Sequence, residues 1–155
     1  MTQTLDGALD ASGIKIALVV SRFNGTITRR LLEGAEDCLD RHGGAPGDRT
    51  VVRVPGAWEL PQAVAKLASG ASYDAIVALG ALVRGETPHF DLLAREVTRG
   101  LGELGVRSGL PIIFGLLTTD TVEQAIDRAG TKGGNKGWDA AQSAIEMVAL
   151  FRRMA

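Results

Sequence analysis

Short, nearly continuous apolar runs alternate with amphipathic stretches along the chain. The runs at 14–20, 50–54, 75–79 and 112–117 are bounded by glycine or polar residues. Runs of this kind are typical of strands that are buried on both faces of a parallel sheet. The run at 50–54 is more polar than the others, which favours a place near an edge of the sheet.

Apolar residues at helical spacing fill the segments between and after these runs. They predict helices around 27–39, 60–67, 90–104, 122–126 and 141–151. Strands that alternate with helices predict a three-layer α/β/α domain around a four-stranded parallel sheet, with flavodoxin-like connectivity and right-handed crossovers.

The chain is expected to hold one domain, at 14–155, preceded by an N-terminal arm at 1–13. The arm has no crossover partner in the pattern. It forms either a loose extension or an added edge strand, which could extend the sheet of a neighbouring chain.

Composition excludes several classes of protein. The 155 residues are 45% hydrophobic and carry a formal net charge of -1, so no basic excess favours nucleic-acid binding. No apolar run approaches the roughly 18 residues of a membrane helix, and we expect neither a targeting segment nor a membrane partner, hence a cytoplasmic protein. One cysteine, Cys38, and two histidines, His42 and His89, predict neither an intrachain disulfide nor a metal site.

Ligands of open α/β sheets bind beyond the carboxyl ends of the strands. That rule selects the segments 21–24, 55–59, 80–89 and 114–119. The third is the richest in chemistry and reads GALVRGETPH.

The third segment predicts an anion site at the start of a helix. Thr87 is a good N-cap and Pro88 fits a first turn, whose free N–H groups would then face the crevice. His89 lies in that turn, where the helix dipole favours the neutral ring and proton exchange near neutral pH. Position alone leaves two interpretations of His89 open, a capping hydrogen bond and catalysis.

Other candidates also have two interpretations. Phe23 and Trp58 could stack on a planar ligand or pack in the core, and Glu59 could simply satisfy a helix N-terminus. Arg128, with the lysines of the glycine-rich 130–137 segment, forms either a solvated basic turn or an anion clamp that reaches a neighbouring subunit. The literal G-x-G-x-x-G at 100–105 carries little weight, because it does not follow a strand.

Several motifs together identify a family. They are SRFN at 21–24, VPGAWELP at 54–61, YDAIVALGALVRGETPHFD at 73–91, PIIFGLLTTDTVEQAIDRAGTK at 111–132 and GNKG at 134–137. With them the chain resembles the lumazine synthases (6,7-dimethyl-8-ribityllumazine synthases) of riboflavin biosynthesis. The resemblance implies a transferase that condenses 5-amino-6-ribitylaminouracil with 3,4-dihydroxy-2-butanone 4-phosphate, releasing phosphate and water, without metal or organic cofactor.

The resemblance also implies a role for each matched position. His89 would transfer protons. Phe114, Arg128 and Lys136 would come from the adjacent subunit, so that the site lies between subunits. The residues implied to bind the pyrimidine and its ribityl chain are Phe23, Ala57, Trp58, Glu59, Ala81, Leu82, Val83 and Phe114; those for the phosphate are Glu86, Thr87 and Arg128; and Asn24 and Lys136 are additional candidates.

Three positions depart from the family pattern. Trp58 stands where a smaller residue is common, so we expect its contact to run through the backbone. Ala81 is smaller than the usual Val or Thr, which loosens that wall. Glu86 places a carboxylate beside a phosphate, which requires that its side chain turn away while the backbone N–H binds.

Members of this family form pentamers, and some build icosahedral shells of twelve pentamers. The short turn at 133–137 resembles the shell-forming members. We therefore expect a homopentamer within an icosahedral shell, with a free pentamer as the alternative and riboflavin synthase as a candidate partner. A second hypothesis for the function is a non-catalytic shell protein on the same fold.

Overall fold

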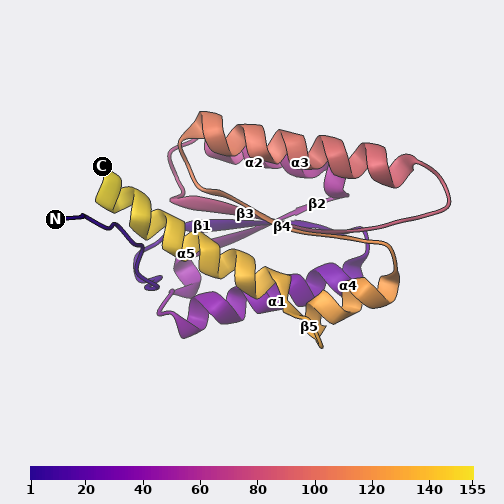
Figure 1. The fold of residues 1–155 in the computed structure, drawn as a ribbon, viewed down its shortest axis with the longest axis horizontal. Helices are drawn as coiled ribbons and strands as arrows, with labels where there is room; N and C mark the ends of the chain where they lie inside the picture. The colour runs from indigo at the N-terminus through magenta and orange to yellow at the C-terminus, as the bar shows by residue number, and fades with distance from the viewer.

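The four apolar runs form one parallel sheet in the computed structural model, which describes residues 1–155 (Figure 1). The strand order is β2-β1-β3-β4. This order and the helices on both faces confirm the predicted three-layer fold with flavodoxin-like connectivity. The strands are β1 (Ile16–Ser21), β2 (Arg49–Val54), β3 (Ala75–Val83) and β4 (Ile112–Thr119).

Burial follows each strand's place in the sheet. Every residue of β1 is buried, and so is β3 up to Leu82, because each of these strands has a neighbour on both sides. β2 is an edge strand and exposes Thr50 and Arg53, as its polar sequence predicts. β4 forms the opposite edge and leaves Ile112, Ile113 and Phe114 only half-buried.

Five α-helices cover the sheet. Helices α2 and α3 lie on one face, and α1, α4 and α5 lie on the other (Figure 1). Alternate residues of a strand serve opposite faces, so Leu18 joins the core beneath α1 and α5 while Val19 joins the core beneath α2 and α3. The helices are α1 (Gly25–Arg41), α2 (Leu60–Ala68), α3 (His89–Ser108), α4 (Val122–Arg128) and α5 (Lys136–Met154).

Helices α1 and α5 approach each other closely. A Cβ on Gly137 would collide with the Leu31 carbonyl, so only glycine fits at this crossing. Asn135 caps α5 by accepting from Trp138 N at 3.0 Å, and its Nδ2 donates to the Arg30 carbonyl at 2.9 Å. These contacts fix the start of α5 against α1.

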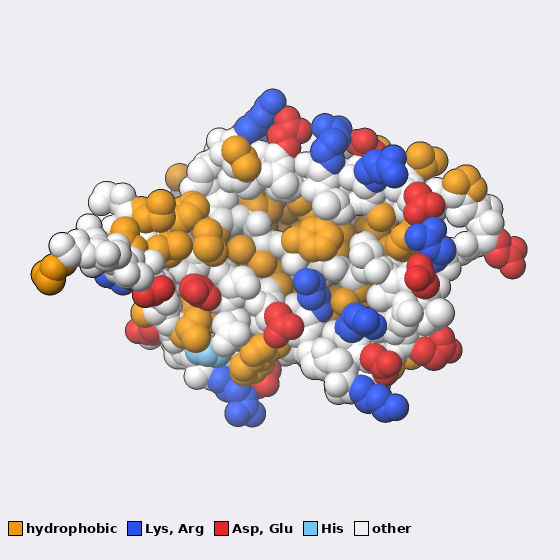
Figure 2. All heavy atoms as spheres, in the orientation of Figure 1, with side chains coloured by type: hydrophobic (Ala, Val, Ile, Leu, Met, Phe, Trp, Pro, Cys, Tyr) orange, Lys and Arg blue, Asp and Glu red, His pale blue; other side chains and the backbone are white.

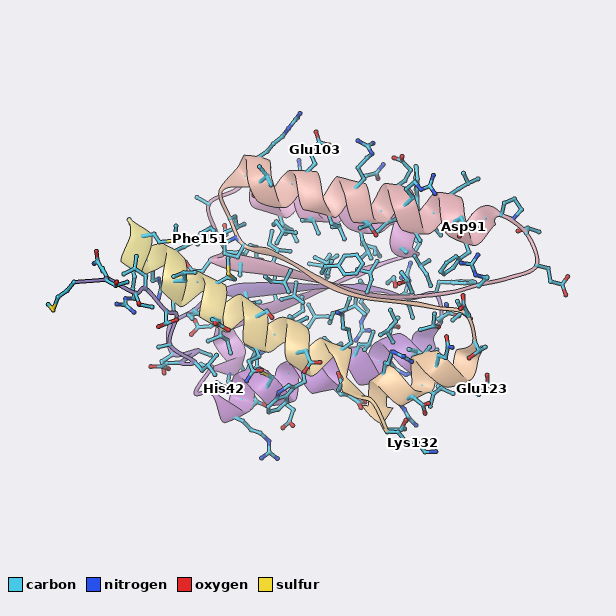
Figure 3. All side chains as sticks on the ribbon, viewed as in Figure 1. His42, Asp91, Glu103, Glu123, Lys132 and Phe151 are labelled. Atoms are coloured by element: carbon cyan, nitrogen blue, oxygen red, sulfur yellow. The ribbon has the colours of Figure 1, made fainter.

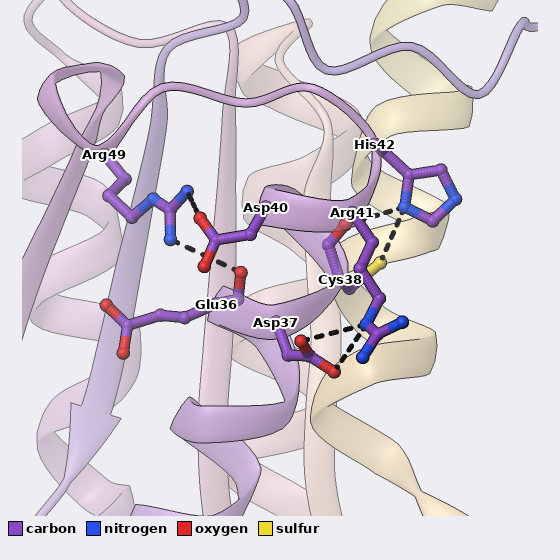
Figure 4. A network of polar contacts seen from close by, with 7 residues as sticks. All are labelled: Glu36, Asp37, Cys38, Asp40, Arg41, His42 and Arg49. Atoms are coloured by element: carbon purple, nitrogen blue, oxygen red, sulfur yellow. Dashed lines mark hydrogen bonds and ion pairs between the residues drawn. The ribbon is translucent and has the colours of Figure 1, made fainter.

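Hydrogen bonds join the carboxyl end of α1 to the start of β2, and others form within the last turns of α1 (Figure 4). Arg49 donates to the Asp40 carboxylate and, at 3.3 Å, to the Glu36 carbonyl. Nδ1 of His42 lies 2.6 Å from the Cys38 carbonyl oxygen, one turn back. The Cys38 side chain is fully buried.

Residues 1–13 form no regular element in this chain. Ala11 is buried and donates its N–H to the His42 carbonyl at 2.8 Å, and Arg153 of α5 donates to the Asp6 carbonyl at 2.7 Å. The arm therefore lies beside the end of α5 (Figure 1). Pairing of the arm with a neighbouring chain stays a prediction.

The glycine-rich segment after α4 has more regular structure than a solvated basic turn. It forms a short antiparallel hairpin of β5 (Ala129–Thr131) and β6 (Gly134–Asn135). Gly130 and Gly134 adopt positive φ, which is the conformation that the tight reversal needs. Two 3₁₀ turns, at Pro46–Asp48 and Ala57–Glu59, precede β2 and α2. None of the helices is both long and apolar enough to cross a membrane.

Candidate active site

A cavity of about 480 Å³ opens beyond the carboxyl ends of β1, β2 and β3. This is where the sheet topology requires a ligand to bind. Most of the residues assigned to the pyrimidine come together there, along with Thr87 and His89. The predicted residues that line the cavity are Phe23, Asn24, Ala57, Trp58, Glu59, Ala81, Leu82, Val83, Thr87 and His89.

Two loops form one rim of the cavity. Arg22 N donates to the Val54 carbonyl at 2.8 Å, and Phe23 N donates to the Pro55 carbonyl at 3.1 Å, so the loop after β1 is bound to the loop after β2. Phe23 and Trp58 are 71% and 55% exposed. Neither side chain is therefore packed in the core, and their interpretation as core aromatics is wrong.

Asn24 lines the cavity and also stabilises the cavity wall through a hydrogen bond of its side chain. Its backbone is left-handed, with φ 60° and ψ 44°, a conformation that asparagine tolerates better than most residues. Its Nδ2 donates to the Ala81 carbonyl at 2.8 Å. The side chain thus joins the end of β1 to the end of β3, beside the residues assigned to the heterocycle.

Glu59 presents a carboxylate that has no partner within the chain. It occupies the N-cap position of α2 but makes no capping hydrogen bond with its side chain. It is half-buried, and its Oε1 lies close to Gly56, where an added Cβ would come within 3.4 Å. An acceptor in this position is available for hydroxyl groups of a ligand.

The start of α3 forms the opposite rim. The helix begins at His89 with Pro88 as its N-cap, one residue later than the predicted Thr87 cap, although Thr87 Oγ1 still accepts from His89 N at 3.4 Å. The His89 ring is exposed and makes no hydrogen bond within the chain. The first-turn N–H groups need a partner from outside the helix, which makes this rim suited to an anion. Glu86 is exposed and does not line the cavity.

Phe90 and Leu93 also line the cavity, outside the segments that the strand-end rule selects. Helical spacing assigns both to the core face of the helix, and both do pack against the core beneath α2 and α3. Leu93 follows His89 by four positions, so helical spacing places these two side chains beside each other. Phe90 and Leu93 together make the cavity largely apolar with a few polar groups, as is usual for small-molecule sites.

The remaining predicted residues gather in a separate hollow of about 380 Å³. Phe114, Arg128 and Lys136 line it, together with residues of β4 such as Thr118, and none of these lines the first cavity. Arg128 is exposed, and its Nη1 donates to the Gln124 carbonyl at 3.1 Å. An apolar band crosses this side of the molecule between the charged side chains over α3 and those over α4 and α5 (Figure 2).

No group of three or more His, Cys, Asp or Glu side chains is placed to hold a metal ion.

Comparison with known proteins decides the family. The family model described as 6,7-dimethyl-8-ribityllumazine synthase matches residues 13–152. The proteins of that name from Chlorobaculum tepidum and Aquifex aeolicus are each 54% identical to this chain over 152 residues. The alignments cover 98% of this chain in both cases, and 98% and 99% of the two relatives.

The chain belongs to the 6,7-dimethyl-8-ribityllumazine synthase family. The resemblance inferred from the motifs is therefore confirmed, and the chain is an enzyme of the transferase class. The range matched to the lumazine synthases contains both hollows, from Phe23 to Asp139.

Proposed function

We propose that this lumazine synthase condenses 5-amino-6-ribitylaminouracil with 3,4-dihydroxy-2-butanone 4-phosphate to give 6,7-dimethyl-8-ribityllumazine, and that each site lies between two subunits. One observation carries the proposal. The chain holds an apolar cavity with His89 and, separately, a hollow with Arg128 and Lys136. The first cavity offers an apolar surface and a histidine, and the second hollow offers two cations. A complete site therefore needs the first cavity of one chain and the second hollow of a neighbouring chain.

The apolar cavity fits the pyrimidine substrate. Phe23 offers an exposed aromatic face for the planar ring. The unpaired Glu59 carboxylate accepts hydrogen bonds from ribityl hydroxyls. Asn24 holds the Ala81 carbonyl, so the Ala81–Val83 stretch forms a fixed wall beside the heterocycle. Phe114 of a neighbouring subunit completes the enclosure.

The phosphate substrate binds at the start of α3. The Thr87 hydroxyl and the backbone N–H groups of the first turn donate hydrogen bonds to the phosphate oxygens, at the positive end of the helix dipole. Arg128 of the neighbouring subunit supplies a full positive charge, and Lys136 lies beside it in the same hollow. The Glu86 side chain points away from the anion, and only its backbone contributes.

The reaction is the one that the family resemblance implies, and this arrangement is compatible with it. The amine of the pyrimidine adds to the ketone and forms a Schiff base with loss of one water, phosphate is then eliminated, and the ring closes with loss of a second water. His89 moves protons between the reacting groups at the rim that both substrates share. Holding the two molecules in register supplies most of the rate, because effective molarity can lower a barrier by roughly 7–11 kcal/mol.

A site divided between subunits requires an oligomer, and the family resemblance implies which one. The edge of β4 is half-buried in a single chain and carries Ile112, Ile113 and Phe114, an apolar surface that a second subunit would cover. We place the protein in homopentamers assembled into an icosahedral shell in the cytoplasm, with riboflavin synthase as a partner. Sedimentation velocity distinguishes the full shell from a free pentamer.

A turnover assay with both substrates tests the function. Formation of the lumazine, followed by its absorbance and by phosphate release, is the expected result. Absence of turnover in an assembled protein would overturn the proposal and favour a non-catalytic shell.

A further inference from the structure

Arg84 is the first residue after β3 and has no role in the site described so far. It precedes the loop at 85–88, which leads to His89 and carries the phosphate-binding Thr87. Every residue of this loop is exposed. The loop therefore depends on few contacts for its shape, and the Arg84 side chain makes hydrogen bonds that join its two ends.

The Arg84 guanidinium joins three segments. Its Nε donates to Asp120 Oδ1 at 2.8 Å, and its Nη1 donates to both carboxylate oxygens of Asp91, at 3.0 and 3.1 Å. It also lies over the Phe90 ring, 4.5 Å from the ring centroid. The backbone N–H of Arg84 donates to the Thr119 carbonyl at 2.8 Å, which extends the sheet by one more bond.

These contacts close the loop into a ring. Arg84 precedes the loop directly, and Asp91 lies in the first turn of α3 after it (Figure 3). The bond between their side chains fixes the separation of the two loop ends. Asp120 anchors this ring to the turn before α4, where its own N–H donates to Gln124 Oε1 at 2.8 Å.

The charges around Arg84 argue against direct binding of the substrate phosphate. Two carboxylates, Asp91 and Asp120, are paired with the one Arg84 guanidinium, so these three side chains together carry a net negative charge and leave no unpaired positive charge on Arg84. The hydrogen bonds to Asp120 and Asp91 raise the pKa of Arg84, which stays cationic and bound to its partners. Free cations for the phosphate come instead from the separate hollow that holds Arg128 and Lys136.

We propose that Arg84 is a positioning residue that sets the shape of the phosphate-binding loop through Asp91 and Asp120. The inference rests on the proposed function, because it assigns the phosphate-bearing substrate to this loop. Arg84 acts by holding Thr87 and the first-turn N–H groups in place, and it does not contact the substrate.

Steady-state kinetics of Arg84→Gln tests the inference. We expect KM for the phosphate-bearing substrate, and Ki for inorganic phosphate, to rise about five- to tenfold. The rise is expected because the variant loses an exposed network of ion pairs that orders the phosphate-binding loop. KM for the pyrimidine should stay within about twofold, because Phe23 and Glu59 lie on other loops. A structural defect without a positioning role would change both KM values or neither.

Asp120→Asn separates positioning from direct binding and does so at an exposed site. If Arg84 positions the loop, this variant weakens phosphate binding in the same direction as Arg84→Gln. Tighter or unchanged phosphate binding, because the arginine is freed, would overturn the inference. Arg99→Gln is the matched control: Arg99 also pairs with two carboxylates, Glu96 and Glu103, but all three lie within α3 and join no loop.

The two proposals fail in different ways. Absence of turnover in the wild-type protein would overturn the proposed function and this inference together. An active wild type with unchanged phosphate KM in Arg84→Gln would overturn this inference alone.

Discussion

His89 is the histidine of the cavity, whereas His42 follows α1 at the opposite end of the sheet (Figure 3). We expect His89→Ala to lower kcat by about 10²–10⁴-fold without abolishing turnover, because one proton-transfer group contributes about that much and substrate positioning remains. The decrease in kcat is measured from the rate of lumazine formation. His42→Gln is the control, since it removes the other histidine but touches no substrate. Wild-type kinetics in His89→Ala would remove the acid–base role.

Cys38 gives a second prediction at the scale of one residue. Burial, with smaller contributions from Asp37 and Asp139, raises the pKa of its thiol from 9.0 to about 11. Above pH 9 the thiol therefore ionises in the unfolded chain but not in the folded one, which favours unfolding. Stability is unaffected by this group below pH 9 and falls between pH 9 and 11.

Urea unfolding at several pH values checks the effect of Cys38. The free energy of unfolding of the wild type should fall more steeply between pH 9 and 11 than that of Cys38→Ala, which lacks the thiol. Equal slopes for the two proteins would contradict the assignment. Comparison of slopes removes the contribution of other groups that titrate in the same range.

At the scale of the element, two glycines in helices should respond to alanine in opposite ways. Gly137 lies in the first turn of α5, where the Leu31 carbonyl leaves no room for a Cβ, so Gly137→Ala should lower the free energy of unfolding by about 1–3 kcal/mol. Gly102 lies in α3, exposed, with nothing near its missing Cβ. Gly102→Ala should therefore raise stability by about 0.5–1 kcal/mol. Thermal and denaturant unfolding measure both, and destabilisation of equal size would contradict this account.

The elements were predictable because their patterns are local. Apolar runs located the four strands of the main sheet, and helical spacing located the five α-helices that cover it. The more polar run at 50–54 identified an edge strand. The N-cap of the helix after β3 was predicted one residue early, at Thr87 instead of Pro88, because sequence alone does not fix the end of a helix to within one residue. The hairpin at 129–135 depends on two glycines with positive φ, a property that composition does not reveal.

The site was predictable only in part. The strand-end rule located the loops, but the exposure of Phe23 and Trp58 depends on how the two loops after β1 and β2 are bonded together. The bridge from Arg84 to Asp120 spans 36 positions of sequence and was invisible to motif analysis. Contacts of this kind become visible only when the topology brings β3 and β4 side by side.

At the scale of the whole molecule, the separation of the two hollows sets what a single chain can do. One chain holds His89 in one hollow and Arg128 in another. If the site lies between subunits, the contact is heterologous: each chain uses one surface toward one neighbour and a different surface toward the next, and such contacts close into a ring. The apolar band along β4 is the surface that such a ring would bury (Figure 2).

Subunit mixing tests this arrangement directly. His89→Ala and Arg128→Ala chains are unfolded together and reassembled at equal amounts, and turnover is measured below the KM for the phosphate-bearing substrate. Random assembly pairs an intact His89 with a neighbour's intact Arg128 at about one site in four, so activity should recover to about a quarter of the wild-type value. Assembled variants combined without subunit exchange are the control and should show no recovery. If the reassembled mixture gives only the mean of the two variants, both residues serve the same chain's site, because intact pairs then never form.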